Sequence, residues 1–335
     1  MYTDENLSSA VKAGIFTEDA VSKFRALVSN EQSMVAVDEE HFRLITGFND
    51  IFVVIACCLL LISVGWIGRE IVTGLGLLAV AITSWGLSEF FVLKRRMALP
   101  AITLLLSFIA GISGFAGVLF RSSGTDFGTL SFLAAGCTGL IATYLHWLRF
   151  RVPITIAAGV AVAIGSIIGI ILVQFPKAEN WSLLMLFIGG LSSFAIAMHW
   201  DMKDPNRLTR KSDVAFWLHL LAAPFIVHPI FFVLGVFEGK NSLPMALIVI
   251  GLYLVLGVIS IAIDRRALMV SALAYVLFSF TTLLKTFGLV SLGFSITGVV
   301  IGSALLLLSA FWHASRTRLL NYAPKRLLTW LPPLK

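Results

Sequence analysis

The segment SDVAFWLHLLAAPFIVHPIFF is apolar enough to lie in lipid, yet it contains two histidines and two prolines. Histidine changes charge near neutral pH, so His219 and His228 could handle protons or contact a substrate. Pro224 and Pro229 each remove a helical hydrogen-bond donor and leave one carbonyl group unpaired. In hydrocarbon each unpaired carbonyl costs several kcal/mol unless a helix, water or ligand supplies a partner. We therefore expect a kinked or broken helix that faces protein.

Two interpretations of this segment remain open. The functional one is a polar cavity, in which an opened backbone and the histidines bind protons or substrate, as in secondary transporters. The other is an ordinary proline kink whose imidazoles are hydrogen-bonded to nearby carbonyl or hydroxyl groups. Nine residues separate the two histidines, which places them on opposite faces of an ideal helix.

A second group of polar residues is expected at the cytoplasmic edge of the apolar runs. His146, His199, Asp201 and His219 fall there, and such side chains can bind zinc. No HExxH or CxxC motif accompanies them. We treat them as weak metal candidates and predict neither a metal site nor another cofactor.

Glu89 is the most notable acidic residue, because it lies about one turn inside an apolar run. A carboxylate at such a position is costly and is usually functional, so Glu89 could couple an ion to transport. It could equally extend toward the basic segment Lys94–Arg96 just beyond the run.

The composition indicates that lipid is the solvent for most of the chain. Only 13% of the residues are charged and 58% are hydrophobic, whereas ordinary soluble domains are about 25% charged. The polar first 48 residues do not read as a cleaved signal peptide. The net charge of +7 is explained by membrane orientation and anionic lipids, and nucleic acid need not be invoked.

We predict an all-α bundle of about ten transmembrane spans, because crossing the hydrocarbon takes about 20 apolar residues. The expected spans lie near 50–68, 71–93, 99–120, 127–148, 152–175, 181–200, 214–237, 243–263, 268–287 and 289–312. The breaks near Ile71 and Gly288 are weak, so nine spans are also possible.

The lysines and arginines indicate how the chain is oriented. With a cytoplasmic N-terminus, the inner breaks and the C-terminal tail contain sixteen of them and the outer breaks contain five. This bias follows the positive-inside rule and predicts cytoplasmic termini. The expected location is the bacterial inner membrane.

Three regions follow from this pattern. Residues 1–48 should form a cytoplasmic helical segment, with Thr17 capping a helix, that docks on the membrane domain, a protein partner or a second copy. Residues 49–313 form the transmembrane domain. Residues 314–335 form a basic tail that suits the membrane interface.

Small residues within the spans predict close helix packing. Gly165 and Gly169 form one G-x-x-x-G pair, Gly298 and Gly302 form another, and the third span contains GISGFAG. Such spacings let two helices approach closely.

The opening AVKAGIFTEDAVSKFRAL, followed by many spans, resembles uncharacterised bacterial membrane proteins that have a short helical N-terminal region and no assigned activity. In helix number the chain is also similar to drug/metabolite exporters. None of their motifs is found, so this second similarity concerns topology alone.

The leading hypothesis is a transporter or permease with a site at the proline-containing seventh span. His219 and His228 would handle protons or a small-molecule substrate, Pro224 and Pro229 would open the backbone, and Glu89 would be a coupling acid. The alternatives are a membrane-embedded metal-dependent enzyme, such as a lipid hydrolase, and a non-catalytic sensor or assembly factor that uses residues 1–48 to recruit a partner.

Overall fold

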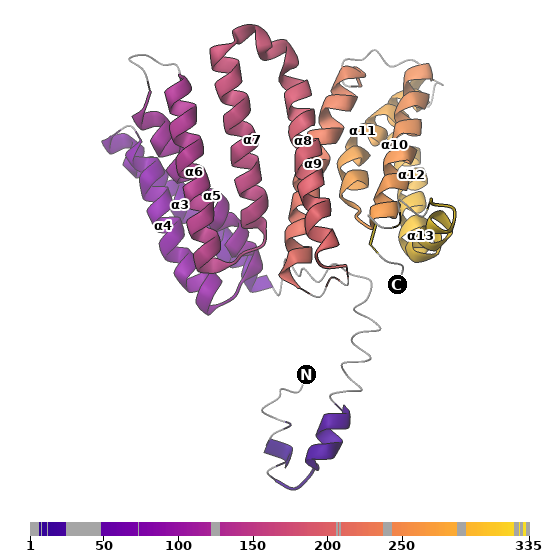
Figure 1. Cartoon of the computed structure of the whole chain (residues 1–335), viewed down its shortest axis with the longest axis horizontal. Helices are drawn as coiled ribbons and strands as arrows, with labels where there is room; N and C mark the ends of the chain where they lie inside the picture. The colour runs from indigo at the N-terminus through magenta and orange to yellow at the C-terminus, as the bar shows by residue number, and fades with distance from the viewer. Residues whose placement is uncertain are drawn as a thin grey trace. The chain divides into compact units, whose positions relative to one another are not determined.

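The computed structural model of the chain contains only helices in its described residues (Figure 1). The structure describes residues 7, 9–11, 13–24, 48–72, 74–121, 128–205, 207, 209–236, 243–286, 293–324, 328 and 331–332. The chain divides into two compact units, Met1–Phe42 together with Lys335, and Arg43–Leu334.

The larger unit is a succession of long helices. They are α3 (Phe48–Ile71), α4 (Leu75–Ser88) with the π-helical turn η1 (Glu89–Lys94), α5 (Ala98–Leu119), α6 (Thr129–Phe150), α7 (Ile154–Gln174), η2 (Pro176–Trp181), α8 (Ser182–Met202), α9 (Arg210–Val233), α10 (Leu243–Ile263), α11 (Ala267–Thr286), α12 (Gly293–Ala310) and α13 (Trp312–Asn321). Their boundaries follow the expected apolar runs closely.

Seven helices in the described part of the chain are long and apolar enough to cross a membrane. The count is eight if α12 and α13, which meet at a bend of 72°, form one span. The described stretches Leu247–Ile263 and Ala267–Thr281 are shorter apolar helices. The all-α class and its compatibility with a membrane are confirmed, whereas ten spans and two cytoplasmic termini stay predictions.

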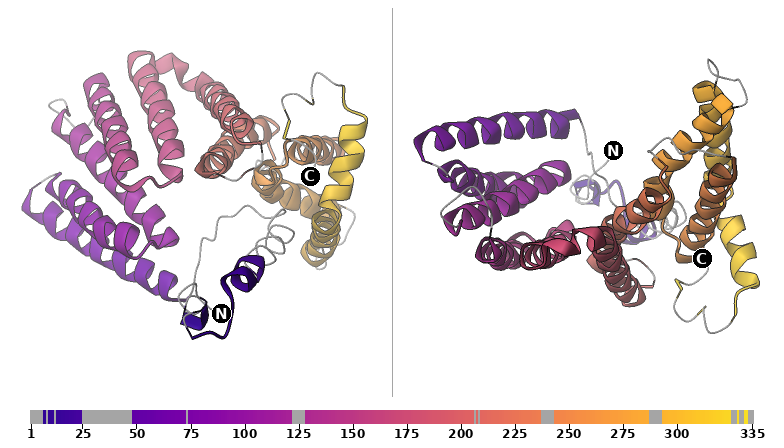
Figure 2. Two further views of the ribbon diagram at one scale, coloured as in Figure 1. Left: turned by 60° about the horizontal axis from the view of Figure 1, so that its bottom comes forward. Right: turned by 90° about the horizontal axis from the view of Figure 1, so that it is seen from above.

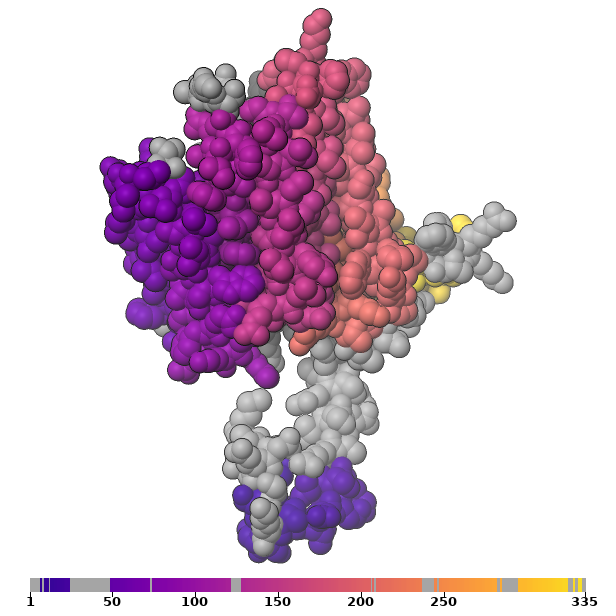
Figure 3. Space-filling view, turned by 60° about the vertical axis from the view of Figure 1, so that its left-hand side comes forward, coloured from indigo at the N-terminus to yellow at the C-terminus, as the bar shows by residue number. Residues whose placement is uncertain are grey.

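The outer surface of these helices is apolar, as a lipid solvent requires. On α3, Phe52, Leu59, Ile62 and Trp66 are each more than 60% exposed. The indigo part of the space-filling view in Figure 3 includes this helix. A soluble protein does not normally expose such a contiguous surface.

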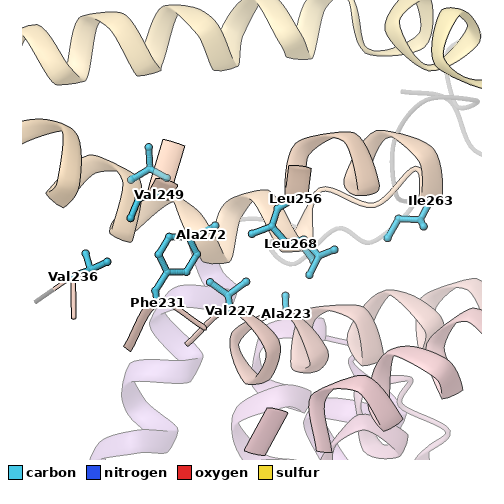
Figure 4. Close-up of a cluster of buried hydrophobic side chains, with 11 residues drawn as sticks. Ala223, Val227, Phe231, Val236, Val249, Leu256, Ile263, Leu268 and Ala272 are labelled. Atoms are coloured by element: carbon cyan, nitrogen blue, oxygen red, sulfur yellow. The ribbon is translucent and has the colours of Figure 1, made fainter. Parts of the chain in front are cut away.

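Helices α3 to α7 pack mainly against their neighbours in the chain, and α8 and α9 form the most extensive pair. Helix α9 also contacts α7 and α11, so it connects the helices that precede it in the chain with those that follow it (Figure 2). Its inner face supplies Ala223, Val227 and Phe231 to an apolar core with residues of α10 and α11 (Figure 4).

The seventh expected span differs from the prediction in one respect. Helix α9 runs without interruption from Arg210 to Val233 through Pro224 and Pro229. Pro229 is buried, but Pro224 is exposed at the surface of the bundle. The structure therefore shows no full break of the helix at the prolines. Ala223, Val227 and Phe231, in the same part of α9, belong to the apolar core.

The smaller unit contains the helix expected after Thr17. The Thr17 hydroxyl accepts a hydrogen bond from the Ala20 amide at 3.2 Å, which is the capping contact that the sequence predicts. Residues 25–47, which the prediction of a docking segment also includes, lie outside the described residues. The same holds for 325–327, 329–330 and 333–335 of the basic tail.

Candidate functional site

A buried group of charged side chains joins the end of α8 to α9. Asp201 lies on the last turn of α8, and His219 lies on the third turn of α9. Asp201 Oδ2 is 2.9 Å from His219 Nε2. The two side chains are 3% and 2% exposed. The extensive packing of α8 on α9 brings these residues together across the helix pair.

A third member comes from the connection between α10 and α11. Arg265 Nη2 donates to Asp201 Oδ1 at 2.6 Å, and the Arg265 side chain is only 2% exposed. The same guanidinium donates to the hydroxyl of Ser212 at 3.2 Å and to its carbonyl oxygen at 3.3 Å. The Ser260 hydroxyl donates to the carbonyl oxygen of Arg265 and so fixes its backbone.

We call Asp201, His219 and Arg265 the buried triad. The positive guanidinium balances the negative carboxylate, so the triad is neutral when the imidazole is neutral. His219 Nδ1 is buried and has no hydrogen-bond partner in the described part of the chain. An unpaired buried polar atom costs about 1–3 kcal/mol, and such exceptions often mark a functional group.

A second layer of charges covers the triad. Arg207 Nη1 is 2.9 Å from Asp264 Oδ2, and Arg207 Nη2 donates to the Asp264 carbonyl oxygen at 3.0 Å. Trp312 Nε1 of α13 donates to Asp264 Oδ1 at 2.7 Å. Arg207 and Asp264 both have positive φ, 55° and 57°. Positive φ is a strained conformation for these residues. The Asp264 carboxylate thus links the turn that contains Arg207 and its own turn to the start of α13.

The environment of Asp264 predicts an acid-dependent loss of stability. Burial by itself raises the pKa of this carboxyl, but Arg207, the Trp312 N–H and Arg316 outweigh it, so the pKa is lowered. A lowered pKa in the folded state stabilises the protein above the unfolded-state pKa of about 4 and ceases to do so as the pH falls through the folded value.

Asp264→Asn should therefore reduce stability at pH 7 and flatten the decline of stability below about pH 4. Thermal unfolding in detergent between pH 7 and pH 3 measures both effects. Asp19→Asn is the control, because its ion pair with Lys23 is exposed. An unchanged acid profile in Asp264→Asn would contradict the assignment.

The four weak metal candidates do not come together. His146 is fully buried and packs against the rings of Trp85, Phe108 and Phe150. Its Nδ1 is 3.3 Å from the Thr155 hydroxyl. His199 is exposed, and only Asp201 and His219 make a pair. Within the described ranges, no three His, Cys, Asp or Glu side chains form a group that could hold a metal ion.

The second histidine of α9 lies in a separate place. His228 Nδ1 is 2.6 Å from the Tyr275 hydroxyl of α11, and the Tyr275 ring stacks on Phe231. The structure does not bring His228 to His219. Pro229 is buried near this pair, whereas Pro224 is exposed.

Glu89 pairs with a residue that the sequence analysis did not connect to it. Its carboxylate accepts from Arg149 Nε at 2.9 Å and from Arg149 Nη2 at 2.7 Å, across from α6. The Arg149 and Glu89 side chains are 54% and 35% exposed. Glu89 also begins the π-helical turn η1, a feature that is frequent at functional sites.

Arg265, Ser212 and Arg207 are the members of the site that sequence reasoning missed. Arg265 and Arg207 were counted only as positive-inside charges. A usable signal was the segment IAIDRRAL, in which an acid and two arginines follow an apolar run without a polar loop. Because this turn is short, its charged side chains must lie close to the ends of the neighbouring helices.

The buried triad brings a carboxylate, an imidazole and a guanidinium together where α8, α9 and the α10–α11 turn meet. Comparison of the chain with protein-family models, with curated proteins and with solved structures gives no match.

Proposed function

We propose that the chain is a proton-coupled transporter of the bacterial inner membrane, with the buried triad as its coupling site. The observation that carries the proposal is the buried imidazole of His219, which contacts Asp201 through one nitrogen and has no hydrogen-bond partner at the other among the described residues. Ionisable groups buried among membrane helices mark proton and substrate pathways.

Protonation of His219 would change the charge balance of the triad. With Asp201 negative and Arg265 positive, an imidazolium adds one uncompensated positive charge at a site that is almost fully buried. A buried charge is expensive unless it is paired. The cost can be relieved by an anionic substrate group, by water, or by a movement of α9 relative to α8. Each route couples the proton to substrate or to conformation.

His228 of α9 and its partner Tyr275 of α11 belong to the same proposal as a second proton-handling pair. Nine residues of helix separate His228 from His219, which corresponds to roughly 13 Å along the axis. The proposed coupling site lies near the N-terminal end of α9, where His219 is. In this proposal Pro224 and Pro229 affect the geometry of the helix and do not bind protons. Glu89 with Arg149 contributes a more exposed ion pair.

The charge distribution supports the orientation within this proposal. The connections that carry Arg207 and Arg265 are among those expected on the positive inner side. The site would then face the cytoplasm, with both termini on that side. We propose further that the N-terminal segment contacts a protein partner or a second copy, because Ile15 and Phe16 are 70% and 49% exposed.

The alternatives have less support. A metal-dependent enzyme would need a cluster of ligands, and the four candidate residues do not form one in the described structure. A non-catalytic sensor or assembly factor would not require a buried triad for its function, so this alternative gives the triad no role.

Proton uptake by proteoliposomes tests the proposal. Vesicles loaded with the pH indicator pyranine are given an inside-negative potassium diffusion potential, and a protein-free extract of bacterial metabolites is added outside. We expect the wild-type protein to acidify the lumen in response to the extract. His219→Gln and Asp201→Asn should reduce the response to that of protein-free vesicles, since each removes one proton-binding group.

His199→Gln is the matched control, because His199 lies on the same turn of α8 as Asp201 but is exposed. Elution as a single species in gel filtration shows that each variant is folded. Equal acidification by wild-type and protein-free vesicles contradicts the transporter proposal, and so does full activity of His219→Gln.

A further inference from the structure

An apolar cavity of about 200 Å³ lies between α10, α11 and α12, next to the start of α13. Its walls include Met269, Val270 and Leu273 of α11 and Leu305 and Leu308 of α12. Val270 is 63% exposed, so the cavity is open to the outer surface of the bundle. That surface faces lipid in a membrane-spanning chain.

One end of this cavity is basic and aromatic. Arg266 and Trp312 line it, and the Arg266 guanidinium carbon lies 4.9 Å from the centre of the Trp312 ring. Arg266 is exposed, and the structure pairs no carboxylate with it in the described residues. Arg265, its neighbour in the chain, is by contrast fully engaged with Asp201.

Two residues that carry hydroxyl groups also line the cavity. They are Tyr253 of α10, whose hydroxyl is buried, and Ser309 of α12, which is exposed. The surface of the cavity itself is almost entirely apolar, which suits an acyl chain.

We propose that this cavity is a binding site for an anionic phospholipid. The phosphate group binds the guanidinium of Arg266, and one acyl chain lies along Val270, Leu273 and Leu305. The charge of Arg266 favours an anionic headgroup over a zwitterionic one. Basic pockets between membrane helices on the cytoplasmic side commonly take such headgroups.

The size and place of the cavity favour a lipid over a compact solute. Pockets for drug-sized ligands occupy roughly 300–1,000 Å³, so a cavity of about 200 Å³ accommodates part of one alkyl chain. Helix α13 turns by 72° from α12 just at Trp312 (yellow in Figure 2). Tryptophan and a helix bent out of the bundle suit the membrane–water interface, where phosphate groups lie.

The lipid site contacts the second layer of charges through a shared side chain. Trp312 stacks with Arg266 on the cavity side and donates to Asp264. Occupancy of the cavity therefore fixes the position of Trp312, whose hydrogen bond holds the turn that carries Arg265. The proposal does not depend on transport activity, since lipid binding is measured directly.

Native mass spectrometry of the full chain in detergent tests the proposal. The protein is titrated with dioleoyl phosphatidylglycerol and, separately, with dioleoyl phosphatidylcholine. We expect the first phosphatidylglycerol to bind about fivefold more tightly than phosphatidylcholine, the preference that one basic residue gives for an anionic lipid. Arg266→Gln should remove this preference.

Two further variants locate the site. Val270→Trp fills the cavity from its exposed side and should weaken the first binding event for both lipids. Arg151→Gln is the matched control, because Arg151 is also exposed and lies over a tryptophan ring, 5.8 Å from the centre of Trp147, but does not line the cavity. It should bind both lipids as the wild type does.

Two results would overturn the site. In one, the wild-type protein binds the two lipids equally. In the other, Arg151→Gln loses as much preference as Arg266→Gln, which would show general attraction of anionic lipid to surface arginines.

Discussion

Arg265→Met is expected to lower the free energy of unfolding by about 3–5 kcal/mol, the usual cost of removing one partner of a buried ion pair. Arg265 and Asp201 are 2% and 3% exposed, and within the described ranges Arg265 and His219 are the basic side chains that lie within hydrogen-bond distance of Asp201. Methionine keeps much of the side-chain length but leaves the carboxylate without its counter-charge. The carboxylate cannot move into water, because α8, α9 and the α10–α11 turn enclose it.

Unfolding by denaturing detergent, followed by circular dichroism, measures the change. Arg266→Met is the matched control, because Arg266 is adjacent in the chain but exposed, and it should change stability by less than about 1 kcal/mol.

The double variant Asp201→Asn with Arg265→Met separates charge from packing. Asparagine removes the buried negative charge and still offers an oxygen to His219, so the double variant should be more stable than Arg265→Met alone. If the double variant loses the sum of both single effects, the two side chains do not act as a pair and the triad is not an electrostatic unit.

The helices of this fold could be predicted from sequence because the apolar runs are long and their breaks are polar. Helix ends such as Ile154 and Val233 lie within a few residues of the expected positions. Ten spans stay a prediction, because the described part of the chain contains seven helices that are long and apolar enough to cross a membrane.

The sequence named two of the three triad residues but not their contact. His219 was named because histidine changes charge near neutral pH, and Asp201 was named only as a weak metal candidate. Arg265 was not, because arginine at a cytoplasmic turn is ordinary and its burial depends on how the α10–α11 turn packs on the end of α8. That packing joins residues that are 64 positions apart in the chain. The segment IAIDRRAL indicates charges close to neighbouring helix ends, but it does not indicate which side chains they contact.

At the prolines of α9 the sequence predicted a kink or a break, and the structure shows no full break. A missing donor predicts a local fault in the helix, but neighbouring helices determine how large it becomes. Here the backbone at Phe225 and Ile226 lies directly against Gly190 of α8. The close helix contact keeps α9 continuous past Pro224.

Close contacts in the bundle also occur at glycines other than those in the predicted pairs. A Cβ at Gly165, Gly298 or Gly302 would meet no atom within 4 Å. A Cβ at Gly111, in the GISGFAG segment, would lie 2.7 Å from the Leu77 carbonyl oxygen. The sequence therefore identified close approaches at Gly111 and at Gly169, where a Cβ would overlap the Phe132 ring, and missed the one at Gly190. The facing helix determines which glycines matter.

Gly190→Ala is expected to destabilise the protein by about 1–3 kcal/mol, the range for forcing an extra methyl group into a packed contact. The added Cβ would lie 2.9 Å from both the Ile226 nitrogen and the Phe225 carbonyl carbon. Both are backbone atoms, so no side chain can rotate away and α9 must separate from α8.

Gly86→Ala provides a control of opposite sign. Gly86 is within α4, and a Cβ there would meet nothing within 4 Å. Alanine should stabilise this helix by about 0.5–1 kcal/mol, since glycine loses more conformational freedom on folding. Unfolding in denaturing detergent should thus shift in opposite directions for the two substitutions. If both stabilise the protein, α8 and α9 do not touch at Gly190, and the helix pair that positions Asp201 beside His219 is arranged differently.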